Sequence, residues 1–160
     1  MEEKKACICR EASEDEWQDA MGLAWRVFLR FNAADYPQEG VENFYHFITD
    51  STLHRMFLAG SYHLFCAFEN EALVGMITIR EAEHISLLFV DGAHHKQGIG
   101  MKLVDMACKY SLARSGCGSA RLTVHAAPYA VEFYHHLGFC DLMPEQEADG
   151  IRFTPMEIRL

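Results

Sequence analysis

Two glycines at a predicted strand-to-helix turn are the first residues of the sequence that indicate a chemistry. Gly98 and Gly100 follow the polar stretch 91–97 and stand at the start of an apolar helical pattern. Glycines at such a turn let backbone N–H groups approach an anion, and the helix start adds the positive end of its dipole. The turn therefore predicts phosphate binding. It is neither a P-loop nor a complete dinucleotide fingerprint, because no Gly-Lys-Ser/Thr follows and Leu103 replaces the third glycine.

The elements that must position this turn follow from the spacing of apolar residues. Segments rich in β-forming residues predict strands, and apolar residues three and four apart predict helices. The predicted strands cover residues 6–10, 62–68, 73–80, 84–90, 120–125, 139–142 and 151–158. The predicted helices cover residues 15–31, 41–48, 52–59, 99–113 and 128–136. Ser13 to Glu16 has the spacing of a capping box before the first helix.

Length and composition favour one domain over residues 1–160. Half of the 160 residues are apolar, which suits a single continuous core. The formal charge of −9 argues against nucleic-acid binding, because that function needs clustered Lys and Arg, and it is compatible with attracting a cationic amine. The sequence has no signal-peptide pattern and no apolar run of about 18 residues. We therefore expect a cytoplasmic protein that has no membrane partner.

The cysteines and paired histidines do not predict a metal site. The six cysteines lie in apolar or helical surroundings, and we expect reduced thiols. Cys7 and Cys9 have no second ligand pair at the spacing of a zinc site. The histidine pairs 94–95 and 135–136 likewise lack a further ligand at recognisable spacing.

Two motifs resemble the hallmarks of the GNAT acetyltransferase superfamily. The stretch 95–100, His-Lys-Gln-Gly-Ile-Gly, is similar to the family's pattern of Arg or Gln, two variable residues, Gly, one variable residue, and Gly or Ala. The stretch 130–139 resembles its second pattern, an Ala, then Phe-Tyr, two variable residues and Leu-Gly-Phe. The chain departs from the family at His95, in place of Arg or Gln, and at Ala127, where many members carry Asn.

The resemblance implies a fold, a co-substrate and its contacts. The fold is α+β, with a mixed, mostly antiparallel sheet of about seven strands, flanked by about four helices and splayed between its two parallel central strands. The co-substrate is acetyl-CoA. Its pantetheine arm would pair with backbone groups of Leu88, Phe89 and Val90. Its pyrophosphate would bind backbone N–H groups of the loop and helix start, namely His95, Lys96, Gln97, Gly98, Ile99 and Gly100.

The resemblance also implies N-acetyl transfer by direct attack in a ternary complex, with Tyr134 as the general acid that returns a proton to the CoA thiolate. An ammonium must lose a proton before it attacks. His84 matches the position of a catalytic histidine in the arylalkylamine acetyltransferase branch, and strand alternation would place Ser86, Leu88 and Val90 on its face. The alternatives are Glu83 or Glu81 acting through a water, and then His125.

The acceptor and the rival functions stay open at this stage. The expected acceptor is a small-molecule amine, with a peptide or protein amine as an alternative. His95 and Ala127 motivate a second function on the same fold, a non-catalytic acyl-CoA sensor or interaction module. The retained Tyr134 argues against the sensor. We also leave open that two copies form a homodimer.

Overall fold

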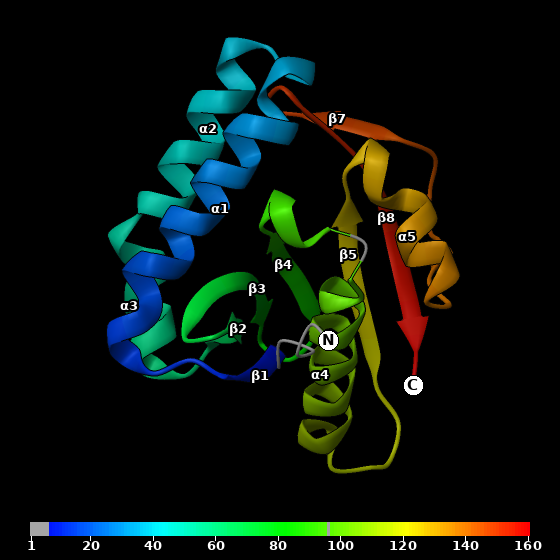
Figure 1. The fold of residues 1–160 in the computed structure, drawn as a ribbon. Helices are drawn as coiled ribbons and strands as arrows, with labels where there is room; N and C mark the ends of the chain where they lie inside the picture. Colours follow the sequence, from blue (N-terminus) through cyan, green and yellow to red (C-terminus); the bar gives the residue numbers. More distant parts are fainter. Residues whose placement is uncertain (1–6, 96) are drawn as a thin grey trace, which may run out of the picture.

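A central mixed sheet carries the fold in the computed structural model, which describes residues 7–95 and 97–160 (Figure 1). Its described strands lie in the order β1-β2-β3-β4-β5-β8-β6, and β7 pairs with β8. They are β1 (Cys7–Glu11), β2 (Tyr62–Glu69), β3 (Ala72–Arg80), β4 (His84–Val90), β5 (Arg121–Ala126), β6 (Cys140–Asp141), β7 (Gln146–Ala148) and β8 (Ile151–Arg159). Neighbouring strands are antiparallel except for β4 and β5, which are parallel. The predicted mixed, mostly antiparallel sheet is confirmed.

Helices cover both faces of the sheet and create two cores (Figure 1). They are α1 (Trp17–Phe31), α2 (Gln38–Thr49), α3 (Ser51–Ala59), α4 (Ile99–Ser115) and α5 (Val131–His136). One core joins α1, α2 and α3 to the sheet, and the second joins α4 and α5 to its other face. Among the described residues, none of the helices has the length and apolar character needed to cross a membrane.

One detail of the sheet differs from the prediction. Residues 144–150 were predicted to form a turn, but Gln146 to Ala148 form the short strand β7 against β8. Its polar residues carry little β signal, so the pairing with β8 decides its conformation.

Two predicted residues lie outside the part of the chain that the structure describes. They are Ala6, predicted to begin the first strand, and Lys96, predicted to bind pyrophosphate.

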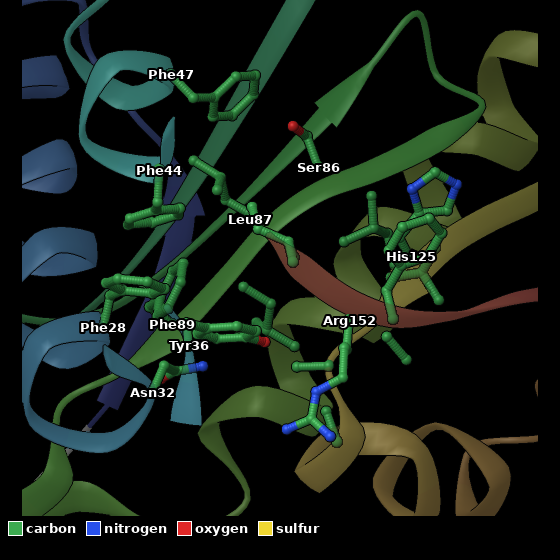
Figure 2. Close-up of a pocket in the computed structure, with 18 of the residues that line it drawn as sticks. Phe28, Asn32, Tyr36, Phe44, Phe47, Ser86, Leu87, Phe89, His125 and Arg152 are labelled. Carbon is green, nitrogen blue, oxygen red and sulfur yellow. The ribbon is translucent and has the colours of Figure 1, made fainter. Parts of the chain in front are cut away.

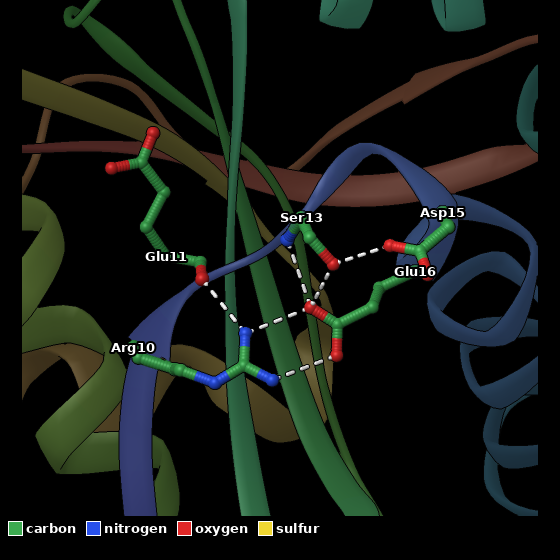
Figure 3. A network of polar contacts seen from close by, with 5 residues as sticks. All are labelled: Arg10, Glu11, Ser13, Asp15 and Glu16. Carbon is green, nitrogen blue, oxygen red and sulfur yellow. Dashed lines mark hydrogen bonds and ion pairs between the residues drawn. The ribbon is translucent and has the colours of Figure 1, made fainter.

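The capping box predicted before α1 is present and is tied to β1 (Figure 3). The Glu16 carboxylate accepts hydrogen bonds from the Ser13 backbone N–H and the Ser13 hydroxyl, each at 2.8 Å. The Arg10 guanidinium donates two more, at 2.8 and 2.9 Å. These bonds lower the pKa of Glu16 to about 2, and the bonds from Arg10 contribute most to this shift. A single 3-10 turn, Glu14–Glu16, then leads into α1.

A bulge in β4 changes which side chains share a face. Thr78 of β3 faces Leu87 and Ile79 faces Ile85, so Ser86 is an extra residue in β4. Ile85 consequently packs into the core under α4, whereas Leu87 packs into the core under α1. The prediction that His84, Ser86, Leu88 and Val90 share one face is therefore wrong, because strict alternation ends at the bulge.

The same bulge precedes the point where β4 leaves β5. The two parallel strands pair only at His84 with Thr123 and at Ile85 with Val124. Beyond these pairs the strands diverge, and their carboxyl ends border an opening in the middle of the sheet (Figure 1). The predicted splay between the parallel central strands is confirmed.

The close approach of α4 to β3 gives a test of the packing. A Cβ atom on Gly75 would lie 3.1 Å from Ile99 and 3.2 Å from Leu103. Gly75→Val should therefore overpack this contact and lower the free energy of unfolding by about 1–3 kcal/mol in urea denaturation. Gly22→Ala is the control, because its Cβ would meet only Arg26 at 3.5 Å. The higher helix propensity of alanine should raise the free energy of unfolding by about 0.5–1 kcal/mol. Equal stability of both variants would contradict this account of the β3–α4 contact.

Candidate active site

A cavity of about 390 Å³ occupies the opening between β4 and β5 (Figure 2). It is lined by α1 and α2 on one side, by β4 and β5 at its base, and by the segment 127–134 and the β7–β8 hairpin on the other side. Most of its large side chains are aromatic, namely Phe28, Tyr36, Phe44, Phe47, Phe89, Tyr129, Tyr134 and Phe153. The cavity thus joins both faces of the sheet at the splay.

The free edge of β4 presents peptide groups to this opening. The Asp91 N–H bonds to the Val74 carbonyl of β3, whereas the Val90 carbonyl turns away from β3 and accepts a bond from His95 Nε2 at 2.8 Å. Because peptide groups alternate along a strand, those of Leu88 point the same way as those of Val90, and those of Phe89 point toward β3. Leu88 and Val90 therefore suit pairing with an extended chain laid in the opening better than Phe89 does.

The turn after β4 leaves backbone donors at the start of α4. Gly98 has φ +78°, a left-handed conformation that favours glycine, and its carbonyl accepts the Lys102 N–H at 3.1 Å. The N–H groups of Ile99, Gly100 and Met101 precede that first helical bond, so the helix supplies them with no carbonyl. A Cβ on Gly100 would lie 3.4 Å from the Phe133 ring, so the helix start packs closely against α5. The predicted anion cradle therefore has the expected backbone geometry.

The side chains of the loop hold the loop itself. His95 bonds to the Val90 carbonyl and its ring lies 4.8 Å from the Phe31 ring. The amide of Gln97 donates to the Ala93 carbonyl at 3.5 Å. His94 Nε2 lies 2.7 Å from the Glu69 carboxylate. These three described side chains are thus engaged with the loop and its neighbours, and the start of α4 offers backbone N–H groups to an anion.

Tyr134 stands on α5 and its ring lies between two other aromatic rings. It is 3% exposed, and its centroid lies 5.1 Å from those of both Phe133 and Phe139 in edge-to-face arrangements. Burial raises the pKa of Tyr134 above its ordinary value, and the nearby Tyr129 adds to the rise. The residue lines the cavity. Its phenol therefore keeps its proton at neutral pH, in a place where it can donate it to a bound group.

The candidate bases lie in different places around the end of the splay where β4 and β5 still pair. His84 is not among the cavity-lining residues, and its Nδ1 lies 2.7 Å from the Thr123 hydroxyl. His125 lines the cavity, stacks on Phe153 at 4.4 Å and lies 4.8 Å from the His84 ring. Glu81 and Glu83 belong to a different, polar pocket beside the start of β4. The structure thus brings His125, rather than the other candidates, to the cavity with Tyr134.

Burial keeps both histidines uncharged. It lowers the pKa of His84 to about 4, and the charges of His125 and Arg80 add to this shift. It also lowers the pKa of His125, with a smaller contribution from Arg80. A neutral imidazole has a nitrogen lone pair that can accept a proton. At neutral pH the pair can therefore act as a base facing the cavity through His125.

Two contacts across the cavity were not predicted from the sequence. Asn32, at the end of α1, donates from Nδ2 to the Tyr129 hydroxyl at 3.0 Å. Asn43 of α2 donates to the Asp149 carbonyl at 2.9 Å, beside the close approach of Gly40 to Gly150. These residues are distant in sequence and stand outside both motifs, so no local pattern marked them. They join the helices to the far wall of the cavity.

A metal-binding group does not emerge from the geometry of residues 7–95 and 97–160. Within those ranges, no three His, Cys, Asp or Glu side chains gather in an arrangement that could hold an ion. The six cysteines are free.

Comparison with known proteins agrees with this fold. Solved structures with the same fold include a GCN5-related N-acetyltransferase from Rhodopseudomonas palustris, with 21% identity, full coverage of both chains and a TM-score of 0.81. The PaiA N-acetyltransferase from Thermoplasma acidophilum, solved with coenzyme A, has 21% identity and a TM-score of 0.74, over 97% of this chain and 99% of its own. A spermidine N-acetyltransferase SpeG mutant from Vibrio cholerae has 14% identity and a TM-score of 0.64, over 96% and 93%. No curated protein sequence matches the chain.

The sequence itself matches a family model. Residues 32–160 match the acetyltransferase (GNAT) domain, and this range contains both motifs, the splayed strands and the whole second half of the sheet. The match covers most of the chain, and the fold agrees with it from β1 to β8. The chain therefore belongs to the GNAT family of acetyltransferases and is an acyltransferase of that family.

Proposed function

We propose that this protein transfers the acetyl group of acetyl-CoA to an amine in a ternary complex, with Tyr134 as the general acid. The observation that carries the proposal is the opening between β4 and β5, which is lined by the free edge of β4 and by Tyr134. The start of α4 lies next to it, where Gly100 approaches Val90 and Phe133. The pantetheine arm would pair with Leu88 and Val90, and the pyrophosphate would accept bonds from the N–H groups at the start of α4. Coenzyme A in two related structures supports this choice of co-substrate.

The reaction follows from groups around the cavity. The neutral amine attacks the thioester carbonyl, a carbon–nitrogen bond forms, and the carbon–sulfur bond breaks. A backbone N–H on the free edge of β4 would polarise the carbonyl oxygen. Tyr134, which burial keeps protonated, supplies the proton to the departing thiolate. No acyl-enzyme is required, and the direct route places both substrates in one cavity.

The proton leaving the amine would pass to His125, which lines the cavity, with His84 as the positioning residue behind it. This differs from the sequence-based assignment of His84 as the base, because His84 contacts Thr123 and the His125 ring and does not line the cavity. The lowered pKa of His125 keeps the ring ready to accept a proton down to pH values below its ordinary pKa of 6.5.

The general-acid assignment predicts a defect in turnover rather than in binding. Tyr134→Phe should lower kcat for amine acetylation about 100-fold or more, because the thiolate loses its proton donor, and leave the Kd for acetyl-CoA nearly unchanged. Steady-state thiol release and calorimetric titration measure the two quantities. Tyr110→Phe is the matched control, since this hydroxyl lies on α4 outside the cavity and its ring stacks on His63. An unchanged kcat in Tyr134→Phe would show that another group protonates the sulfur.

The backbone cradle predicts an effect of charge at Gly98. Asp and Asn have the same shape and both tolerate a positive φ, so Gly98→Asp and Gly98→Asn differ mainly in charge. The carboxylate should repel the pyrophosphate, and we expect the Kd for acetyl-CoA to be at least about 10-fold higher in the Asp variant than in the Asn variant at low salt. Titration at low and high ionic strength measures the difference. Equal affinities would refute the cradle at this turn.

The base assignment predicts a change in the acid limb of the pH profile. In the wild type, kcat/KM should stay high below pH 6.5 and fall only as His125 is protonated, because its pKa is lowered in the fold. His125→Ala should lower kcat/KM and remove that limb. His84→Gln should keep a limb but shift it, because His84 no longer shapes the surroundings of His125. His46→Ala, on α2 and outside the cavity lining, is the control.

The opposite result in these variants would support His84 as the base. If His84→Gln removes the acid limb while His125→Ala retains it, His84 is the base. If neither variant changes the limb, both histidine assignments are wrong.

A further inference from the structure

Arg152 brings a positive charge to the cavity without a carboxylate partner. It lies on β8 and lines the cavity opposite the aromatic side chains of α1 and α2 (Figure 2). No carboxylate of the described residues lies within 4.0 Å of its guanidinium, and its only side-chain hydrogen bond reaches the Asp35 carbonyl at 3.5 Å. Arg10, in contrast, makes a two-point pair with Glu16. The Arg152 fork is therefore available to bind an anionic group.

The acidic side chains in and around the cavity do not make it a site for cations. Asp149 is the one acidic residue among the described lining, and it lies in the turn of the β7–β8 hairpin. Asp35 and Glu145, which influence the neighbouring Tyr36, are not part of the lining. A polyamine would bring at least one ammonium group besides the reacting amine. The lining offers little to hold that second charge, and Arg152 would repel it.

The walls of the cavity suit an apolar body. Phe28 and Phe44 stack at 4.1 Å, and Phe44 contacts Phe89 at 5.6 Å, which forms a continuous aromatic surface on the helix side. Phe153 extends the apolar wall on the side of β8. An acceptor that covers these rings would bury apolar surface on both sides.

Asn32 fixes the position of Tyr129 on the wall of the cavity. The residue is 4% exposed, its Nδ2 is used by the Tyr129 hydroxyl, and its Oδ1 is buried without a partner among the described residues. Tyr129 in turn is close enough to Tyr134 to influence its pKa. The Asn32–Tyr129 bond therefore holds the Tyr129 ring beside Tyr134 on this wall of the cavity.

We propose that the acceptor is an amino acid with an aromatic or large aliphatic side chain, whose carboxylate binds Arg152 and whose side chain packs on the aromatic wall. This inference rests on the proposed acetyl transfer and names its substrate class. The amine nitrogen bonds to the acetyl carbon as the bond to sulfur breaks. The amine proton passes to the base, the Tyr134 proton passes to the sulfur, and the products are an N-acetyl amino acid and CoA.

Matched acceptors that differ only in the carboxylate test the proposal. Thiol release from acetyl-CoA is measured with L-phenylalanine against phenethylamine, with L-leucine against isoamylamine, and with spermidine as the polyamine. The wild type should favour each amino acid over its decarboxylated partner in kcat/KM by about 10-fold or more, the size expected for a charged hydrogen-bonded pair. A preference for the simple amine or for spermidine overturns the proposal and leaves the proposed acetyl transfer intact.

Variants of Arg152 and Asn32 distinguish recognition of the carboxylate from effects shared by both acceptors of a pair. Arg152→Gln should lower kcat/KM for the amino acids about 10- to 100-fold and leave the simple amines nearly unchanged, and Arg152→Lys should give a smaller loss because it keeps the charge without the planar fork. Asn32→Ala should instead weaken both members of a pair equally, since it removes the bond that fixes Tyr129 on the wall that both acceptors would contact. Arg159→Gln, on the same strand but 83% exposed and paired with Glu157, is the control.

Two results distinguish failure of this inference from failure of the proposed function. If Arg152→Gln affects both members of each pair equally, the arginine does not recognise the carboxylate, and the substrate class is wrong. If acetyl-CoA stabilises the protein to heat but no acceptor releases thiol, the catalytic function itself is wrong, and this inference falls with it.

Discussion

The separation of β4 from β5 is the constraint on which the rest of the structure depends. Parallel strands normally continue their ladder, and a buried peptide group without a partner costs about 1–3 kcal/mol. Here the ladder stops after Ile85 and Val124, directly beside the extra residue Ser86. The bulge bends β4 and reverses the faces of the residues that follow. The peptide groups exposed by this divergence are those that would pair with the co-substrate in the proposed function.

The divergence is held open by the two cores and not by the sheet. Leu87 and Phe89 belong to the core under α1, whereas Leu88 and Val90 pack against the core under α4. Successive residues of β4 are therefore anchored to opposite layers. Because each layer has its own helices, β4 is fixed in place even though it has lost its neighbour on one side. The Asn32–Tyr129 and Asn43–Asp149 bonds then connect the walls above the opening.

The sequence was informative where a signal is local. Gly98 and Gly100 needed only their place between a strand and a helix, and Ser13 with Glu16 needed only a spacing of three residues. Both motifs also identified the family, which implied the mixed, mostly antiparallel sheet and the splay. The bulge at Ser86 has no such signal, because it depends on how Thr78 and Ile79 of another strand pair with β4. This is why the faces of β4 were assigned wrongly from alternation.

The same limit applies to the functional residues. Arg152 and Asn32 come from opposite walls of the cavity, and their sequence neighbours form a turn-rich hairpin and a helix end. His84 was favoured over His125 because family position was the available guide, whereas access to the cavity depends on where β5 diverges from β4. Tyr134 could be identified because its motif is contiguous. Residues that meet only in the fold require the tertiary contacts to be known.

The charge of the chain acts on two scales in this picture. A formal charge of −9 attracts ammonium groups from a distance, but salt screens exposed charges over about 8 Å. At the cavity the nearest charges and dipoles decide, and there the aromatic walls and the Arg152 guanidinium dominate. An acidic surface and a cationic residue at the site are thus compatible. A zwitterion satisfies both, because its ammonium agrees with the outer field and its carboxylate with the local one.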